Sequence, residues 1–345
     1  MRTNRITLLV LLALGIFAFY ACEKNDDDFL SKDEAEQLIK LEDKEYGRNA
    51  DRMKFSDSYS DTLDLLRVSD YFFNELTSNQ YDDSYIEFSV SEVDFSYELK
   101  NVNQFNNITG TWTPSSSWYG FTRTSTTPSD KVIIIYPSDY GNVKATFYDY
   151  NNQNNTISVK VKIEKNNAVI CNLTCSRTEN TQEDSRKTNA TITFGSYSIE
   201  YEESDYDYSN EDKDKDIEKI IIKKDNKVFF SKTYNIQWEY LGGVDYYNIV
   251  SKWTFGNLEL NLNVDTNSNQ IDNSDRNTFI NFSASTKGKK VGDFVYEKDE
   301  LWKVLFKFTN GEKVEVEGLM PQIYECLKHN PYSDIYWDIY DGGYK

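Results

Sequence analysis

Carboxylates are the side chains of this sequence whose number and spacing most directly suggest chemistry. The chain of 345 residues carries 57 Asp and Glu residues against 38 Lys and Arg. The densest acidic run, "EESDYDYSNEDKDKD", covers residues 202–216. Oxygen-bearing side chains stand there at offsets 1, 3, 5, 7 and 12, namely Asp205, Asp207, Ser209, Glu211 and Asp216. An EF-hand loop presents its Ca²⁺ ligands at these same offsets.

This acidic run also departs from an EF-hand in two ways. Asn210 occupies offset 6, where the loop needs a glycine, and the flanking residues are expected to form strands instead of helices. Asp205, Asp207 and Glu211 are therefore candidate calcium ligands, and the alternative is a solvated hairpin tip. We predict no zinc site, because the chain has a single histidine and the spacing of its cysteines matches no known arrangement of zinc ligands.

The motifs of the common enzyme classes are absent from the sequence. His329 is the only histidine, so a Ser-His-Asp or Cys-His site would need it as the base. No G-x-S-x-G elbow accompanies it, and no Gly-rich phosphate loop stands between a strand and a helix. We predict no catalytic residue and no cofactor. The alternative is a carboxylate-based glycan hydrolase, since two acids can cleave a glycosidic bond.

The segment "GTWTPSSSWYGF", residues 110–121, holds the candidate ligand-binding residues. Trp112, Trp118 and Tyr119 lie there among Gly, Ser and Pro. Aromatic rings that project from a polar loop can stack on the apolar faces of sugar rings. The alternative is that the three rings plug the end of a sheet or pack into the core.

Three cysteines in the body of the chain leave the disulfide state open. Cys171 and Cys175 fall on one face of a predicted strand, about 13 Å apart. A disulfide needs Cα atoms within about 7 Å, so these two cannot pair with each other there. Cys326 can reach one of them in some folds. The alternative is that all three are small buried hydrophobic residues.

The elements that must position these residues are mostly strands. A capping box, Ser31-Lys32-Asp33-Glu34, starts a helix that we expect to end near Tyr46, and a second helix is predicted over 60–76. From Tyr85 onward the hydrophobic period is two. Strands are then predicted near 85–90, 93–99, 131–136, 143–149, 156–164, 168–177, 189–202, 217–224, 227–240, 247–255, 258–264, 278–285, 301–309 and 312–317.

Three segments predict the way in which these strands connect. "VKIEKNNAVICNL", "IIIKKDNKVFFSK" and "VLFKFTNGEKVEVEG" each join two alternating runs through a short turn that contains asparagine. The fold class is therefore mainly β, with antiparallel hairpins that form a barrel, a sandwich or a curved sheet. Short helices precede the sheet, and one short helix begins at Pro321 near the C-terminus. The tail, residues 332–345, alternates like a last edge strand.

The segment "TENTQEDSRKT", residues 178–188, has the composition of a linker. It predicts a first part over 31–177, with the helices and half of the strands, and a second β half over 189–345. The alternative is that residues 178–188 form one long loop inside a single domain. About 320 residues can bury a core in either arrangement.

The N-terminus has the pattern of an export signal. Arg2 and Arg5 precede an apolar run from Ile6 to Ala21, and Cys22 follows at once. The run of 16 residues is short for a transmembrane helix. It resembles the signal peptide of a bacterial lipoprotein, which implies cleavage after residue 21 and acylation of Cys22.

The residues after Cys22 extend this resemblance. Residues 22–30 form an acylated tether in this interpretation, and Asp26, Asp27 and Asp28 resemble the export signal of surface lipoproteins in Bacteroidota. The resemblance implies an outer-membrane protein held by lipid and facing the cell surface, with the periplasmic leaflet as the alternative. Asp61-Thr62-Leu63 resembles the O-glycosylation motif of that group, which makes Thr62 a candidate modification site.

Net charge limits the partners. The chain has a formal charge of −19, and loss of the two arginines of the signal peptide makes it about −21. Such a surface repels nucleic acid, so we expect no nucleic-acid partner. We predict a non-enzymatic, lipid-anchored envelope protein that binds a glycan or another surface protein. The alternatives are the hydrolase and a structural or adhesive subunit of the envelope.

Overall fold

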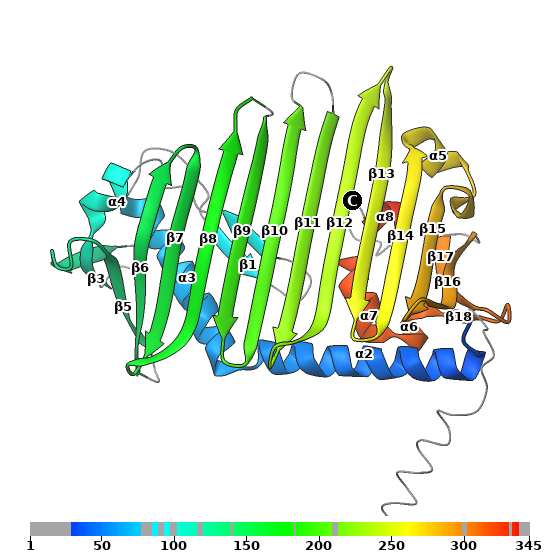
Figure 1. Cartoon of the computed structure of the whole chain (residues 1–345), viewed down its shortest axis with the longest axis horizontal. Helices are drawn as coiled ribbons and strands as arrows, with labels where there is room; N and C mark the ends of the chain where they lie inside the picture. Colours follow the sequence, from blue (N-terminus) through cyan, green and yellow to red (C-terminus); the bar gives the residue numbers. More distant parts are fainter. Residues whose placement is uncertain are drawn as a thin grey trace, which may run out of the picture.

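The structure is a computed structural model that describes residues 29–76, 85–88, 93–96, 102–115, 120–138, 141–182, 184–208, 213–298, 302–330 and 333–337. A single sheet of 16 strands forms its body (Figure 1). The strands are β3 (Gly110–Pro114), β4 (Phe121–Ser125), β5 (Val132–Ser138), β6 (Gly141–Gln153), β7 (Thr156–Lys165), β8 (Ala168–Asn180), β9 (Ser185–Phe194), β10 (Tyr197–Tyr208), β11 (Lys213–Lys224), β12 (Lys227–Leu241), β13 (Val244–Phe255), β14 (Leu258–Asn267), β15 (Ile280–Thr286), β16 (Lys289–Lys298), β17 (Trp302–Phe308) and β18 (Lys313–Glu315).

The strand order follows the chain almost without exception. From β5 to β18 each strand pairs antiparallel with the next, and β3 is inserted between β5 and β4, parallel to β5. A separate hairpin pairs β1 (Tyr85–Phe88) with β2 (Val93–Ser96). The large sheet ends at β4 and at β18, so it does not close on itself. The mainly β prediction is confirmed in its curved-sheet form, and neither a barrel nor a sandwich is formed.

Turn chemistry explains why the hairpins repeat. Five of the two-residue turns place both residues at positive φ, as a type I′ turn requires. They are Asn154-Asn155, Asn166-Asn167, Asp225-Asn226, Gly242-Gly243 and Lys287-Gly288. Asparagine, aspartate and glycine tolerate this left-handed backbone best. The three predicted hairpins are confirmed as β7–β8, β11–β12 and β17–β18.

Burial alternates along the strands, so the sheet has a covered face and an open face. On β13, Ile249, Ser251, Trp253 and Phe255 are buried, whereas the residues between them are mostly exposed. The helices that accompany the sheet are α2 (Lys32–Lys54), α3 (Asp57–Leu76), α4 (Val102–Ile108), α5 (Ser268–Asn273), α6 (Val316–Leu319), α7 (Pro321–Lys328) and α8 (Ser333–Tyr336), with the 3₁₀ turn η1 (Arg276–Thr278). Most of the core lies between these helices and the covered face.

Helix α2 packs on the covered face in the half of the sheet that ends at β18 (Figure 1). It contacts β12, β13, β14 and β16, and it also contacts α7. Tyr46 packs on Phe230 and Phe255, with ring centroids 5.6 and 4.9 Å away. Glu42 accepts a hydrogen bond from Asn257 Nδ2 at 2.8 Å, in the β13–β14 turn. The helix therefore joins one end of the chain to strands more than 200 residues further on.

Asp43 of α2 caps the start of α7. Its Oδ1 accepts hydrogen bonds from the backbone N–H groups of Gln322 and Ile323, at 2.8 and 2.9 Å. Asp43 is buried, and burial raises the pKa of its carboxyl, although the two N–H donors act in the opposite direction. The cap stabilises α7 because the first N–H groups of a helix have no partner inside the helix.

Two predicted helices were too short. The capping box at Ser31 is confirmed, but α2 continues past Tyr46 to Lys54, and α3 begins at Asp57 instead of residue 60. Gly47 stands inside α2 because α7 approaches closely there. A Cβ at Gly47 would lie 2.6 Å from Gln322 Cγ. The predicted helix at Pro321 is confirmed as α7, which buries Ile323.

Two predicted strands were wrong. Residues 189–202 do not form one strand, because Gly195 takes a φ of 54° and reverses the chain between β9 and β10. The tail does not begin as an edge strand, because residues 333–336 form the helix α8. Residues 338–345 lie outside the described part of the chain. Tyr336 and Trp337 are buried there, so their apolar side chains fill the core instead of one face of a strand.

The segment expected to be a linker lies within the sheet. Thr178 on β8 pairs with Lys187 on β9, and the ladder reaches Asn180 opposite Ser185. Residues 178–188 are thus mostly the ends of two paired strands with a short turn. The sheet runs through this point without interruption, and the core also continues across it.

We predict that Asp43→Ala lowers the free energy of unfolding by about 1–3 kcal/mol, because two buried N–H groups lose their acceptor. Chemical denaturation measures this change. Asp51→Ala, at an exposed position of the same helix, is the matched control and should change stability by less than about 0.5 kcal/mol. Equal effects of the two substitutions would contradict the capping role.

Candidate functional site

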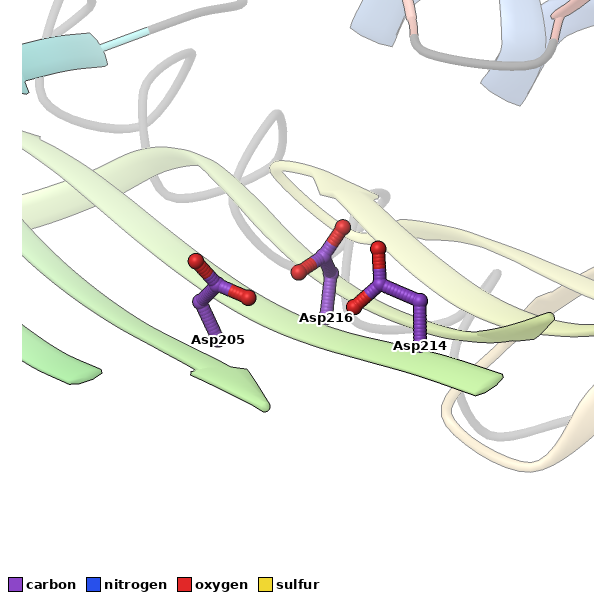
Figure 2. Close-up of side chains that lie close together, drawn as sticks. All are labelled: Asp205, Asp214 and Asp216. Atoms are coloured by element: carbon purple, nitrogen blue, oxygen red, sulfur yellow. The ribbon is translucent and has the colours of Figure 1, made fainter. Parts of the chain in front are cut away.

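A cluster of carboxylates lies on the covered face of the β10–β11 hairpin (Figure 2). Asp205 on β10 lies directly opposite Asp216 on β11. Asp214 precedes Asp216 by two residues on β11 and therefore lies on the same face. One carboxyl oxygen from each of these three residues lies within 4.8 Å of the others. The hairpin register therefore brings three acids together that are up to 11 residues apart.

The segment that held the calcium candidates contains all three residues, and its described part follows the alternative, a hairpin. Most of residues 202–216 belong to paired strands, since β10 continues to Tyr208 and β11 begins at Lys213. Asp205 belongs to the cluster. Asp207 pairs with Asp214 in the register, and Glu211 lies outside the described residues. An EF-hand loop is excluded here because the ligands come from two paired strands.

Burial and mutual repulsion dominate the electrostatics of the cluster. Burial, followed by the neighbouring carboxylates of Asp214 and Asp205, raises the pKa of Asp216 to about 7. Burial also raises the pKa of Glu203, two residue pairs further along the hairpin and on the same face. Arg186 Nη2 donates to Asp205 Oδ2 at 2.8 Å. The ion pair places one positive charge beside three acids, so the cluster keeps an excess of negative charge.

A second ion pair lies deeper in the same face. The Lys232 side chain is fully buried, and its Nζ lies 2.7 Å from Glu218 Oε1. The ammonium also lies over the ring of Tyr234, 5.2 Å from the centroid. A buried ammonium needs such an opposite charge, because desolvation is otherwise too costly. The covered face therefore carries charged groups on this part of β10–β12, although Ile199 and Ile220 on the same strands are buried in the apolar core.

Two kinds of chemistry suit the carboxylate cluster. Three carboxyl groups at this separation can share a proton, as like charges do when they cannot all ionise. Their oxygens are also the donor type that Ca²⁺ and Mg²⁺ prefer, and Asp205, Asp214 and Asp216 would be the ligands. Within the described residues this is the one group of acids, cysteines or histidines close enough to hold a metal ion.

The open face carries a pocket of about 660 Å³ across β11–β14. Its side chains form two cross-strand rows. The first row joins Lys215, Gln237, Asn248 and Asp265, and the second joins Lys213, Glu239 and Tyr246. Leu241 lies two residues beyond Glu239, on the same face at the end of β12. Tyr246 is 41% exposed and Leu241 is 52% exposed, so the pocket combines an accessible apolar surface with amides and charges.

Trp112, predicted as a binding residue, is not accessible. It is buried, and its indole N–H donates to the carbonyl of Ile108 at 2.8 Å. Phe72 packs edge-on against it at 5.3 Å, and the Arg123 guanidinium lies 5.6 Å from its ring. Its placement follows the alternative, in which the ring packs into the core. Trp118 and Tyr119 lie outside the described residues.

The other candidate residues also have definite places. Thr62 is fully buried in α3, where its Oγ1 donates to the carbonyl of Ser58 at 2.5 Å, so a glycosyltransferase cannot reach it in the folded chain. Cys171, Cys175 and Cys326 are buried and form no disulfide. Burial raises the pKa of Cys171 to about 12, which makes its thiol unreactive. His329 is the C-cap residue of α7, and Cys22 lies outside the described residues.

Comparison of the chain with protein-family models, with curated proteins and with solved structures finds no match. Among the helices of the described residues, none is both long and apolar enough to cross a membrane. The candidate sites therefore depend on the geometry of this chain alone.

We predict that Asp216→Asn raises the melting temperature by about 2 °C at pH 8 and changes it little at pH 4. Because the folded pKa of Asp216 lies above its unfolded value, its ionisation destabilises the fold. This penalty is small near pH 4, grows up to about pH 7 and is constant above it. Solvent at this half-buried site screens part of the penalty, which keeps the shift small.

Melting curves of the wild type and the variant at both pH values measure this effect. Asp130→Asn, at an exposed bend, is the control and should shift neither curve. A lower melting temperature of Asp216→Asn at pH 8 would show that the ionised carboxylate is stabilising.

Proposed function

We propose that this protein is a lipid-anchored component of the bacterial cell envelope that presents the open face of its sheet to a glycan or a partner protein. The observation that carries the proposal is Cys22, placed between an apolar run and an acidic tether. Acylation there holds the chain in the outer membrane with the body outside the bilayer. A triply acylated cysteine has more than the two hydrophobic chains that stable anchoring needs.

The attachment point of the body supports this arrangement. Phe29 forms a parallel bridge with Lys290 on β16, and the Leu30 N–H donates to the Lys290 carbonyl at 3.0 Å. The chain therefore enters the body at the β16–β18 end of the sheet (Figure 1). Seven residue steps separate Cys22 from Phe29, so this end lies within about 25 Å of the acylated sulfur.

Attachment at one end leaves the open face available. Its pocket is built from β11–β14, and β15 separates these strands from β16, to which Phe29 is bridged. The pocket contains Tyr246, two amides and both signs of charge, which is the mixture that small-molecule sites use. We therefore favour ligand binding over a purely structural role.

The sheet edges also disfavour the structural alternative. Edge-to-edge assembly needs a long unpaired strand, but β4 has five residues and β18 has three. Lys313 on β18 adds a charge that discourages pairing. A subunit that polymerises through its sheet would leave longer edges at both ends.

The glycan hydrolase remains the second candidate function because of the carboxylate cluster. Asp216 has a pKa of about 7, a value suited to a general acid at neutral pH. Retaining glycosidases hold two carboxyl groups about 5–5.5 Å apart, which is close to the spacing of Asp205, Asp214 and Asp216. Hydrolysis of a glycan that Asp216→Asn abolishes would replace the binding proposal by this one.

We predict that Cys22→Ser releases the protein from the membrane fraction and abolishes incorporation of radioactive palmitate. Serine has no sulfur to receive the diacylglyceryl group, so neither cleavage nor anchoring follows. Fractionation of cells that express each variant measures the first effect, and labelling measures the second. Cys326→Ser, which removes a buried thiol, is the control and should leave label and location unchanged. Label that persists in Cys22→Ser would refute the anchor.

A further inference from the structure

The backbone of β11–β14, which lies beneath the pocket on the open face, cannot hydrogen-bond to a ligand. Each of these strands pairs with a neighbour on both sides, so its N–H and C=O groups are already used in the ladder. A peptide cannot add a strand here, because strand addition needs a free edge. Any ligand must therefore be held by side chains.

On the open face the pocket has two lysines and two acids, and Asp214, which the register places on the other face of β11, adds a third acid to the lining. Lys213 and Lys215 oppose Glu239 and Asp265, and Lys213 Nζ lies 3.3 Å from Glu239 Oε1. Lys215 Nζ lies over the ring of Tyr206, 5.5 Å from its centroid. Both ammonium groups are thus engaged, and no cluster of free positive charge is present to bind a phosphate or a sulfate. The lining suits an uncharged ligand.

The remaining groups point to a ligand that is both apolar and rich in hydroxyls. Tyr246 and Leu241 offer exposed apolar surface, and Gln237 and Asn248 are an adjacent cross-strand pair of amides. An amide donates and accepts hydrogen bonds, as a sugar hydroxyl does. An aromatic ring can at the same time pack against the apolar C–H face of a pyranose.

The dimensions agree with a short oligosaccharide. Four strands at a spacing of about 4.8 Å make a footprint about 14 Å long, and two rows of side chains are about 7 Å apart along the strands. A volume of about 660 Å³ lies within the range of sites for small molecules. The pocket is open to solvent on the uncovered face, so a longer chain can extend beyond it.

We infer that this pocket, built from Tyr246, Leu241, Gln237 and Asn248, binds a neutral oligosaccharide. The inference deepens the proposed function, because it names the ligand class that the open face takes. It depends on the side chains of β12 and β13 and not on the lipid at Cys22. The two proposals can therefore fail separately.

The test uses the full-length chain purified in detergent. A glycan array carrying neutral hexose, pentose and N-acetylhexosamine oligosaccharides is the probe, together with acidic uronic-acid and sulfated saccharides. We expect binding to neutral members only. Tyr246→Ala should weaken this binding at least tenfold, since the stacking surface is lost, and Gln237→Ala should weaken it as well.

Tyr240→Ala is the matched control. Tyr240 has a similar exposed fraction, 43%, and belongs to the same β12–β13 hairpin, but it does not line the pocket. It should bind as the wild type does, and circular dichroism should show that all three variants are folded. The inference is overturned if no neutral glycan binds, if only acidic saccharides bind, or if Tyr246→Ala binds as well as Tyr240→Ala. None of these results affects palmitate labelling at Cys22.

Discussion

Coverage of one face by α2 is the constraint on which the rest of this structure depends. A sheet of 16 strands that does not close has two faces, and the aromatic side chains on one of them must be removed from water. Tyr46 contributes a ring to that core, and Asp43 fixes α7 beside it. Gly47 lets the two helices approach closely. The open face then needs no cover, because its strands present mainly polar side chains.

Charged groups interrupt the apolar core of the covered face. Apolar packing fills the face from β13 to β17, where Trp253, Phe282, Phe294 and Phe306 form a continuous set of contacts. Part of β10–β12 carries carboxylates and the buried Lys232, and beyond them β5–β9 again bury apolar side chains. Raised pKa values follow from acids that are only half removed from water. This charged part of the covered face is thus the place where ionisation and stability oppose each other.

Local patterns predicted most of the fold, and register explains what they missed. The Ser31 capping box and the Asn-containing turns are signals within a few residues, and they were right. Gly195 was the single sign of a turn inside an alternating run, and it was not enough to reveal a hairpin. Asp214 joined the cluster through cross-strand pairing, which no spacing along the chain discloses. The pocket residues come from four strands, so only their alignment brings them together.

The nearest-neighbour order of the strands has a consequence for how such a molecule arises and folds. Because each strand from β6 to β17 pairs only with its predecessor and successor in the chain, this part of the sheet behaves as a linear array. Ordering can spread from hairpin to hairpin with small loop-closure entropy, and the long-range contacts of α2 close last. Duplication or deletion of a hairpin would lengthen or shorten such an array without changing its topology. The width of the sheet is thus an evolvable quantity, limited by the helices that cover one face, since α2 contacts β12, β13, β14 and β16 and α3 contacts β6, β8 and β9.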